Sequence, residues 1–428
     1  MAPPIDHPAL PACFSLQAGR LSLDPQDPGF FANPYPAYAA LVEDGGIARW
    51  DAIGCHAVAR HDLVASILKD RRFGRIVPHD AEGRPDFSQK PAHLRAFYAL
   101  ESHSLLELEP PTHTRLRALL TKAFVSRQIE RLAPQIAAIA DALIDDFAGH
   151  QTVDLIAAYA SPLPVRVIAD LLGVPASASG SLLDWSHRMV AMYTPGRSED
   201  TERAANQAAD EFAIFLREII DEKRKRPSDD LISALIAAET EGGRLDRDAL
   251  ISLVVLLLNA GHEATVHQIG NAVKTILEWR GATGADPALL FVDDATAAAT
   301  VEETLRFDPP LHLFERYALE SVELPGGVTL ARGDKVALLL AAANRDPAAF
   351  AEPDRFVPGR FLDRSTKTVT SFGGGIHFCI GAPLARLELK IALARLFSRC
   401  PALRMIRPPR YRDTWHFHGL EKLAVTVA

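Results

Sequence analysis

Hydrophobic positions recur at helical spacing along most of the chain. Apolar residues three and four positions apart predict helices over 37–43, 61–69, 94–100, 114–124, 127–147, 164–172, 179–193, 201–225 and 250–279. A further helix is expected after Arg226-Pro227, with Ser228 or Asp229 as its N-cap. The pattern therefore predicts a mostly helical protein.

Alternation of apolar and polar residues is confined to short stretches. It predicts a hairpin near residues 48–59, with Gly54 close to the turn, and strands at 322–324, 328–330 and 335–340. Strands segregated among many helices favour a mostly α fold with small β regions over alternating βαβ units. Residues 76–108 lack sustained periodicity apart from one short helix, and a connection this long is usually a functional lid or disordered.

Length and composition add limits to this fold. A chain of 428 residues allows about three domains, but it has no Gly/Ser linker, repeat or low-complexity tract. We therefore expect a single domain over residues 1–428, preceded within it by a loosely ordered leader at 1–20. The leader lacks the basic start and apolar run of a signal peptide.

Charge and cysteine content indicate the compartment and exclude some partners. The net charge of −8 argues against nucleic acid as a partner. The four cysteines form no C-x-x-C pair and suit a reducing cytoplasm. The longest apolar run, Leu250–Leu258, is too short to span a bilayer. We expect a cytoplasmic protein that is not bound to membranes.

The stretch Ser371–Gly381 concentrates the chemistry. Three consecutive glycines let the backbone approach a bulky planar group, since no Cβ intervenes. Cys379 follows, and Pro383 suits the first turn of a helix that continues to Phe397. A cysteine just before a helix N-terminus is favoured as a thiolate, which is a metal ligand.

The composition of the chain narrows the choice of metal. A tetrahedral zinc site needs about four Cys or His ligands at short spacings, and the cysteines here are scattered. One thiolate suffices if a macrocycle such as haem supplies the other ligands. A phosphate-binding loop is disfavoured because no Lys-Ser or Lys-Thr follows the glycines. A structural cysteine after a flexible turn is the alternative interpretation.

The stretch Ser371–Gly381 contains the pattern F-G-x-G-x-H-x-C-x-G, which resembles the haem-thiolate loop of the cytochrome P-450 family. The resemblance extends from Asn33-Pro-Tyr-Pro36 to the C-terminal strands. It implies a triangular, mostly helical fold that encloses haem b, with Cys379 as the axial ligand of the iron. Within the loop it assigns contacts with the haem to Phe372, Gly373 and Gly381.

The same resemblance implies the reaction and its partners. We expect a monooxygenase that inserts one atom of O₂ into a small organic substrate. Electrons would come from NAD(P)H through a ferredoxin and a ferredoxin reductase, and the enzyme is expected to be a monomer.

Two further motifs fit this family. Glu303 and Arg306 are spaced to share one helix face, as in many solvated helix ion pairs. By resemblance, they match the E-x-x-R element, and Arg360 in Phe356–Phe361 matches the F-x-P-x-R-F element. The three are expected to form a buried structural triad that supports the thiolate loop.

Haem carries two propionates, which need cations. His113 and Arg117 lie four residues apart on a predicted helix and can face one anion. Taken singly, such residues are more often surface charges. By resemblance, His113, Arg117, Arg316 and His377 all occupy propionate-binding positions.

The long helix at 250–279 provides the candidate catalytic residues. Leu256, Asn259, Ala260, Glu263 and Ala264 recur at helical spacing and share one face. The Ala260-Gly261 pair makes that face thin, which leaves room for a diatomic ligand.

The corresponding segment of the family reads A-G-x-D/E-T, and its acid and threonine help to deliver the protons that oxygen activation consumes. Here Glu263 supplies the acid, Ala264 replaces the threonine, and Thr265 comes one residue late. One step along a helix turns a side chain by about 100°, so Thr265 cannot substitute directly.

Substrate contacts follow from the family's pocket-lining regions, although ordinary core packing explains the apolar residues equally well. The candidate substrate-contacting residues are Leu256, Asn259, Leu311, Leu313, Phe97, Tyr98 and Phe417.

Two other functions are compatible with the replacement at Ala264. One is a peroxide-using or rearranging haem-thiolate enzyme without redox partners, and the other is a haem-binding protein without turnover.

Overall fold

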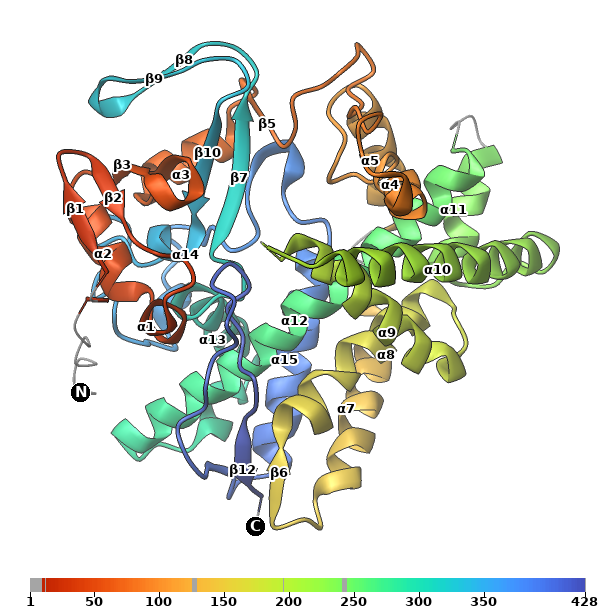
Figure 1. Cartoon of the computed structure of the whole chain (residues 1–428). Helices are drawn as coiled ribbons and strands as arrows, with labels where there is room; N and C mark the ends of the chain where they lie inside the picture. The colour runs from red at the N-terminus through yellow and green to blue at the C-terminus, as the bar shows by residue number, and fades with distance from the viewer. Residues whose placement is uncertain (1–9, 12, 125–128, 195, 241–244, 428) are drawn as a thin grey trace. The chain divides into compact units, whose positions relative to one another are not determined.

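The computed structural model describes residues 10–11, 13–124, 129–194, 196–240 and 245–427 (Figure 1). The fold is about 54% helical with small sheets, which confirms the predicted class. The chain forms two compact units, one of residues 1–74, 136–161 and 264–428, and one of residues 75–135 and 162–263. The single domain expected from the sequence stays a prediction.

A seven-stranded sheet organises the first unit, with strand order β1-β2-β3-β4-β10-β7-β5. β10 lies between β4, to which it is parallel, and β7, to which it is antiparallel. One face of the sheet covers a core that includes Phe30, Trp50 and Trp415, whose rings lie edge-on or tilted to one another. The strands are β1 (Ser15–Gln17), β2 (Arg20–Ser22), β3 (Ile47–Trp50), β4 (Cys55–Val58), β5 (Phe73–Gly74), β7 (Leu313–Ala318) and β10 (Lys335–Leu339).

Two strand regions correct the sequence analysis. The expected loose leader is wrong for Ser15–Gln17 and for Arg20, because they form the β1–β2 hairpin, which pairs with β3. β7 was not predicted, because Glu315 and Arg316 interrupt its apolar pattern. It forms nevertheless, because β10 and β5 supply hydrogen-bonding partners on both of its edges. The predicted hairpin is confirmed as β3 and β4, with Gly54 at its turn.

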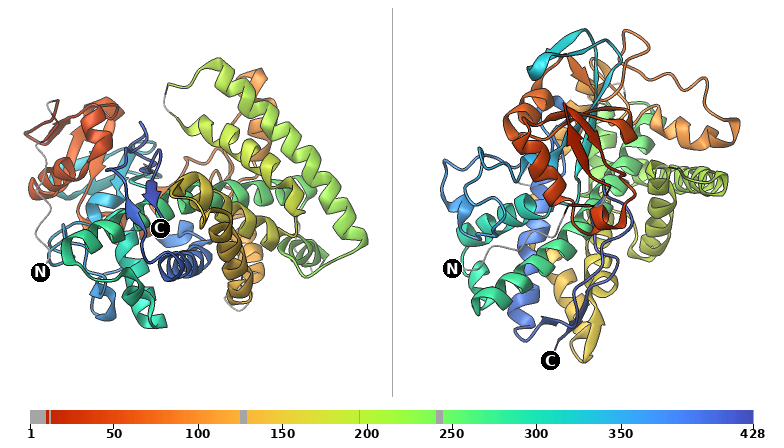
Figure 2. Two further views of the ribbon diagram at one scale, coloured as in Figure 1. Left: turned by 90° about the horizontal axis from the view of Figure 1, so that it is seen from below. Right: turned by 60° about the vertical axis from the view of Figure 1, so that its left-hand side comes forward.

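Segments far apart in the sequence form the three-stranded sheet of the first unit. β6 (Thr152–Asp154) pairs with β12 (Ala424–Thr426), which also pairs with β11 (Arg404–Met405); Figure 2 shows the yellow and dark blue strands side by side. β8 (Val322–Leu324) and β9 (Val328–Leu330) lie at the predicted positions and pair with each other in a separate hairpin.

Helices pack around these sheets. α3 ends where the sequence predicts, at Lys69, and α13 packs against α15. The helices of the first unit are α1 (Pro28–Ala32), α2 (Tyr35–Glu43), α3 (His61–Lys69), most of α7 (Ala133–Phe147), α13 (Asp294–Phe307), α14 (Leu340–Ala343) and α15 (Ala382–Arg399). The predicted start of the helix at 127–147 falls partly on residues 125–128, which lie outside the described residues.

The described residues of the second unit form helices joined by loops and no strands. Its longest helix within the unit, α10, begins at the cap Ser198, whose hydroxyl accepts a hydrogen bond from the Thr201 N–H. α10 packs on α9, where Trp185 stacks on Phe212 with ring centroids 5.1 Å apart. The helices are α4 (Arg95–Glu101), α5 (Thr112–Ala123), α8 (Pro162–Leu172), α9 (Ser179–Val190), α10 (Glu199–Lys225) and α11 (Leu231–Thr240).

One helix belongs to both units. α12 (Arg247–Thr283) runs for 37 residues and passes from the second unit to the first between Glu263 and Ala264. By length and composition it could cross a membrane, but 72% of its most apolar stretch is buried within the protein. α12 therefore has the burial of a core helix.

Candidate functional site

The loop Ser371–Gly381 presents a cysteine at the start of a helix. The Cys379 N–H donates to the Phe372 carbonyl (3.0 Å), which closes the loop. α15 begins directly afterwards, with Gly381 as its N-cap and Pro383 in its first turn, as predicted. Cys379 and Phe378 are exposed in the described protein, although the loop around them is apolar. The sulfur of Cys379 is therefore exposed at the positive end of an 18-residue helix, which favours a thiolate.

Two of the three glycines are required by the fold itself. Gly373 and Gly375 have φ values of +69° and +66°, where other L-residues are strained. A Cβ on Gly373 would lie 2.8 Å from a ring carbon of Phe314 on β7, and one on Gly375 would collide with the Leu68 carbonyl oxygen on α3. The loop thus lies flat against the sheet and α3.

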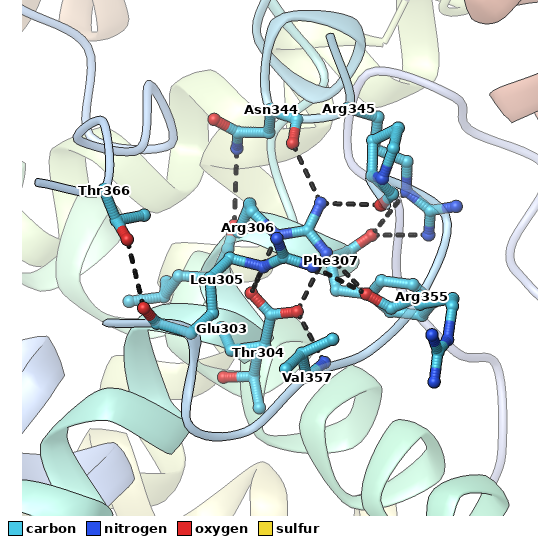
Figure 3. Close-up of polar contacts among 12 residues, drawn as sticks. Glu303, Thr304, Leu305, Arg306, Phe307, Asn344, Arg345, Arg355, Val357 and Thr366 are labelled. Atoms are coloured by element: carbon cyan, nitrogen blue, oxygen red, sulfur yellow. Dashed lines mark hydrogen bonds and ion pairs between the residues drawn. The ribbon is translucent and has the colours of Figure 1, made fainter. Parts of the chain in front are cut away.

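Glu303 is the centre of a buried ion-pair network (Figure 3). Its carboxylate accepts from Arg306 Nε (2.7 Å) and Nη2 (2.9 Å), and Arg360 Nε donates to the same group at 3.0 Å. The Val357 N–H donates a fourth hydrogen bond at 2.8 Å. The side chains of Glu303 and Arg306 are fully buried. The structure therefore brings together the three residues that the sequence analysis named, and the one carboxylate lies between two guanidinium groups.

A second set of hydrogen bonds joins this network to the loop. Arg306 Nη1 donates to the Asn344 carbonyl at 3.0 Å, and Asn344 Nδ2 donates to Ser371 Oγ at 2.7 Å. The Thr370 N–H in turn donates to Asn344 Oδ1 at 2.8 Å. The start of the cysteine loop is therefore held by α13 and α14 through Asn344, a residue that the sequence analysis did not identify.

The four predicted propionate ligands fall into two pairs on different units. Arg316, on β7, is 2% exposed and packs over the ring of Phe314, and His377 is half-buried in the cysteine loop. His113, which is buried, and Arg117, which is half-buried, lie one turn apart on α5 of the second unit. Binding of propionates by these residues stays a prediction.

The predicted substrate-contacting residues are likewise divided between the units. In the first unit, Leu311 and Phe417 form a β-bridge, and Leu313 begins β7. In the second unit, Phe97 is 3% exposed, whereas the ring of Tyr98 packs on Phe87 with a centroid distance of 4.8 Å. The structure brings Leu311 and Phe417 together but does not relate them to Phe97 and Tyr98.

Between its exposed ends, α12 is least buried near its middle. Leu256, Asn259 and Ala264 are half-buried and Ala260 is exposed, on the face that the sequence predicts. Thr265 is 6% exposed, consistent with the rotation of one residue along the helix. Asn259 Nδ2 lies 3.7 Å from Met189 Sδ, and its Oδ1 is buried with no hydrogen-bond partner among the described residues.

The carboxylate of Glu263 is not exposed on that face but lies close to two histidines. Its Oε2 is 3.6 Å from His187 Nε2 on α9 and 3.7 Å from His262 Nδ1. The sequence analysis identified neither histidine. His262 stands beside Glu263 in the sequence and could have been noted, but His187 is 76 residues away and carries no signal of its own.

Comparison with known proteins agrees with this arrangement of residues. The sequence profile described as Cytochrome P450 matches residues 296–409. Cytochrome P450 107B1 of Saccharopolyspora erythraea is 39% identical over 418 residues, which cover 93% of this chain and 96% of that protein. The chain belongs to the cytochrome P450 family.

Other members of the family show the same extent of similarity. The 6-deoxyerythronolide B hydroxylase of Saccharopolyspora erythraea is 36% identical over 390 residues, covering 89% of this chain and 92% of that one. The structure described as epothilone B-bound cytochrome P450epoK has a TM-score of 0.84 and 28% identity, over 95% of this chain and 99% of that chain. This protein is accordingly a haem-thiolate monooxygenase that uses O₂ on a small organic molecule.

Cytochromes P450 bind haem b, and the residues of this protein fit that group. The loop Ser371–Gly381 offers one thiolate donor at a helix N-terminus. Its glycines pack closely on Phe314 and Leu68, and the exposed side chains of Ile376 and Phe378 between them and Cys379 are apolar. One sulfur ligand within an exposed apolar loop suits an apolar macrocycle, whereas a zinc ion requires several protein ligands close together.

Proposed function

We propose that the Cys379 thiolate is the axial ligand of the haem iron and that NAD(P)H supplies electrons through a ferredoxin and its reductase. The observation that carries this proposal is the position of Cys379, exposed at the N-terminus of α15 in a loop anchored by Asn344. The helix N-terminus stabilises a thiolate. Haem, when bound, supplies the chemistry of oxygen activation.

We assign the charges of the haem propionates to His113, Arg117, Arg316 and His377, and the loop contacts to Phe372, Gly373 and Gly381. The cationic character of these residues and their places in the family motifs support the assignment. The exposed Ala260 on α12 supports its assignment to the haem-facing surface of that helix, because a small side chain permits close approach.

Proton delivery is proposed to depend on Glu263 and on the substrate. Ala264 has no hydroxyl to hold a water, and Thr265 is buried. The unpaired Oδ1 of Asn259 can accept a hydrogen bond from a substrate hydroxyl, since an unpaired buried amide oxygen is costly. We therefore propose an organic substrate with a hydroxyl near the carbon that is oxidised.

The apolar side chains proposed to surround this substrate supply its affinity through burial. The printed names of relatives, such as 6-deoxyerythronolide B hydroxylase and vitamin D(3) 25-hydroxylase, support hydroxylation as the reaction type. The proposed apolar contacts are Leu256, Leu311, Leu313, Phe97, Tyr98 and Phe417.

Ligation by Cys379 is tested by the spectrum of the reduced protein with carbon monoxide. The native protein should show the red-shifted Soret band of thiolate-ligated haem, and Cys379→Ser should lose it. Replacement of Cys13, Cys55 or Cys400 by serine is the matched control and should leave the band in place. An unchanged band in Cys379→Ser would show that another residue ligates the iron.

Substrate-assisted proton delivery is tested by the product formed per NADH in a system reconstituted with ferredoxin and its reductase. Substrates with a hydroxyl near the oxidised carbon should couple tightly, and matched hydrocarbons should release hydrogen peroxide instead. Ala264→Thr should reduce the difference. Tight coupling on plain hydrocarbons would refute this route.

Ala264 also favours a second candidate, an enzyme that takes peroxide ready-made. Turnover with hydrogen peroxide that exceeds turnover with NADH, ferredoxin and reductase would favour it.

A further inference from the structure

Two histidines and a carboxylate meet at the surface of the second unit. His187 lies in the last turn of α9, and His262 and Glu263 are consecutive on α12. One nitrogen from each imidazole and one carboxylate oxygen all lie within 4.8 Å of one another. We call these three residues the open cluster.

The separations within the open cluster are those of ligands around a metal ion. Glu263 Oε2 is 3.6 Å from His187 Nε2 and 3.7 Å from His262 Nδ1. These distances exceed a hydrogen bond, which spans about 2.7–3.2 Å. Bonds of about 2.0–2.2 Å to a tetrahedral ion place neighbouring ligand atoms about 3.4 Å apart. The two separations from Glu263 are within about 0.3 Å of this spacing. The third, between the two imidazole nitrogens, is at most 4.8 Å, so the imidazoles would move toward each other on binding.

Access and donor type favour the same conclusion. The side chain of His187 is 49% exposed, whereas those of Glu263 and His262 are 11% and 1% exposed. An ion can enter on the side of His187 and keep one position for water, as zinc does when it has three protein ligands. Imidazole and carboxylate donors suit zinc and its divalent neighbours. The adjacent Arg188 pairs with Asp184 and Glu211, so its charge is already compensated.

We propose that the open cluster is a binding site for a divalent transition-metal ion of the zinc class. Such an ion would hold the carboxylate of Glu263 as a ligand. This consequence rests on the proposed function, in which Glu263 carries protons: the bound ion would remove the acid from proton delivery and lower turnover. The site would make the enzyme sensitive to free zinc.

Binding is tested by equilibrium dialysis of Zn²⁺ against the full haem-loaded protein, with Cys13→Ser as the background because Cys13 is an exposed thiol that can itself bind zinc. One Zn²⁺ per chain is expected. His187→Ala and His262→Phe should each weaken binding at least about tenfold, since loss of a residue that merely supports a metal ligand costs about 10–100-fold. His150→Ala, at another exposed histidine, is the matched control and should bind as the parent does. No bound zinc, or equal affinity in His187→Ala and His150→Ala, would refute the site.

The consequence for catalysis is measured separately. Addition of Zn²⁺ should lower product formation in the parent and have at least tenfold less potency against His187→Ala. Binding of zinc without loss of turnover would refute the link to Glu263, whereas absence of turnover before zinc is added would count against the proposed function and not against the metal site.

Discussion

The open cluster has a counterpart in the first unit, built from the same residue types. Asp308, His312 and His418 also place their ligand atoms within 4.8 Å of one another, but all three are at most 3% exposed. We call them the sealed cluster. The two clusters differ in what else contacts the histidines and the carboxylate, and in whether water can reach them.

Hydrogen bonds already occupy the sealed cluster. Asp308 accepts from the Tyr35 hydroxyl (2.7 Å) and the Tyr411 hydroxyl (2.6 Å). His312 Nε2 lies 3.1 Å from the Pro309 carbonyl, so it must carry the proton, and Nδ1 is left to accept from Tyr38 at 3.1 Å.

A metal ion would have to displace these partners and lose its water in a buried site. The comparison indicates that residue type alone does not define a metal site. Access for water and competing hydrogen bonds determine whether such a cluster is structural or can take part in chemistry.

Among variants of the two clusters, Glu263→Gln in the open cluster should have the largest effect, which is a loss of turnover. If the open cluster serves chemistry, loss of the acid should lower coupled turnover by about 10²–10⁴-fold. The midpoint of urea unfolding should move little, because glutamine has nearly the same shape as glutamate and the neighbouring His187 is half exposed. Turnover with NADH, ferredoxin and reductase measures the effect on catalysis, and urea unfolding measures the effect on stability. If Glu263→Gln unfolded at a much lower urea concentration but kept normal turnover, the open cluster would be structural and not catalytic.

The sealed cluster should give the opposite result in Asp308→Asn. The amide removes the charge that accepts from Tyr35 and Tyr411 and turns an N–H₂ group toward one hydroxyl. The free energy of unfolding should fall by about 3–5 kcal/mol, as for other broken buried charged contacts. Denaturant unfolding followed by circular dichroism measures this loss. A loss below about 1 kcal/mol would show that the network is not structural.

The pH dependence of stability sharpens the comparison. Burial lowers the pKa of His312 well below its usual value, aided by His418, and lowers that of His418, aided by Lys274, although Asp308 opposes the shift at His312. Both are thus neutral in the folded protein, whereas the unfolded chain binds protons below about pH 6.5.

The stabilisation conferred by these two histidines is therefore present above that pH and lost as the pH falls, by up to about 1.4 kcal/mol per pH unit for each proton. Urea unfolding between pH 7 and 5 should show this slope. His312→Gln with His418→Gln should flatten it, and His187→Ala should not. Equal slopes in all three proteins would contradict the assignment.

The smallest effect is expected for His187→Ala. Its half-exposed side chain leaves no large cavity, so the free energy of unfolding in the absence of zinc should change by no more than about 0.5 kcal/mol. Thermal unfolding in the presence of a chelator measures it. A loss of several kcal/mol would place His187 with the structural residues of the sealed cluster.

Much of the fold and of the cysteine loop follows from the sequence alone. Helix periodicity and caps are local, which is why α3 and α10 form where they are predicted. The loop around Cys379 could also be predicted, since its glycines, its cysteine and the following proline act through adjacent backbone. The partners of Glu303 were found because short motifs carry them.

Only the tertiary structure decided the rest, because it depends on contacts between distant segments. β7 forms against β10 and β5 despite its charged residues, and β1 is held by pairing that a local pattern does not reveal. His187 approaches Glu263 only because α9 packs beside α12. The sequence determined which side chains were available. Long-range packing determined that His312 and His418 are sealed among tyrosines, whereas His187 stays half exposed to water beside Glu263.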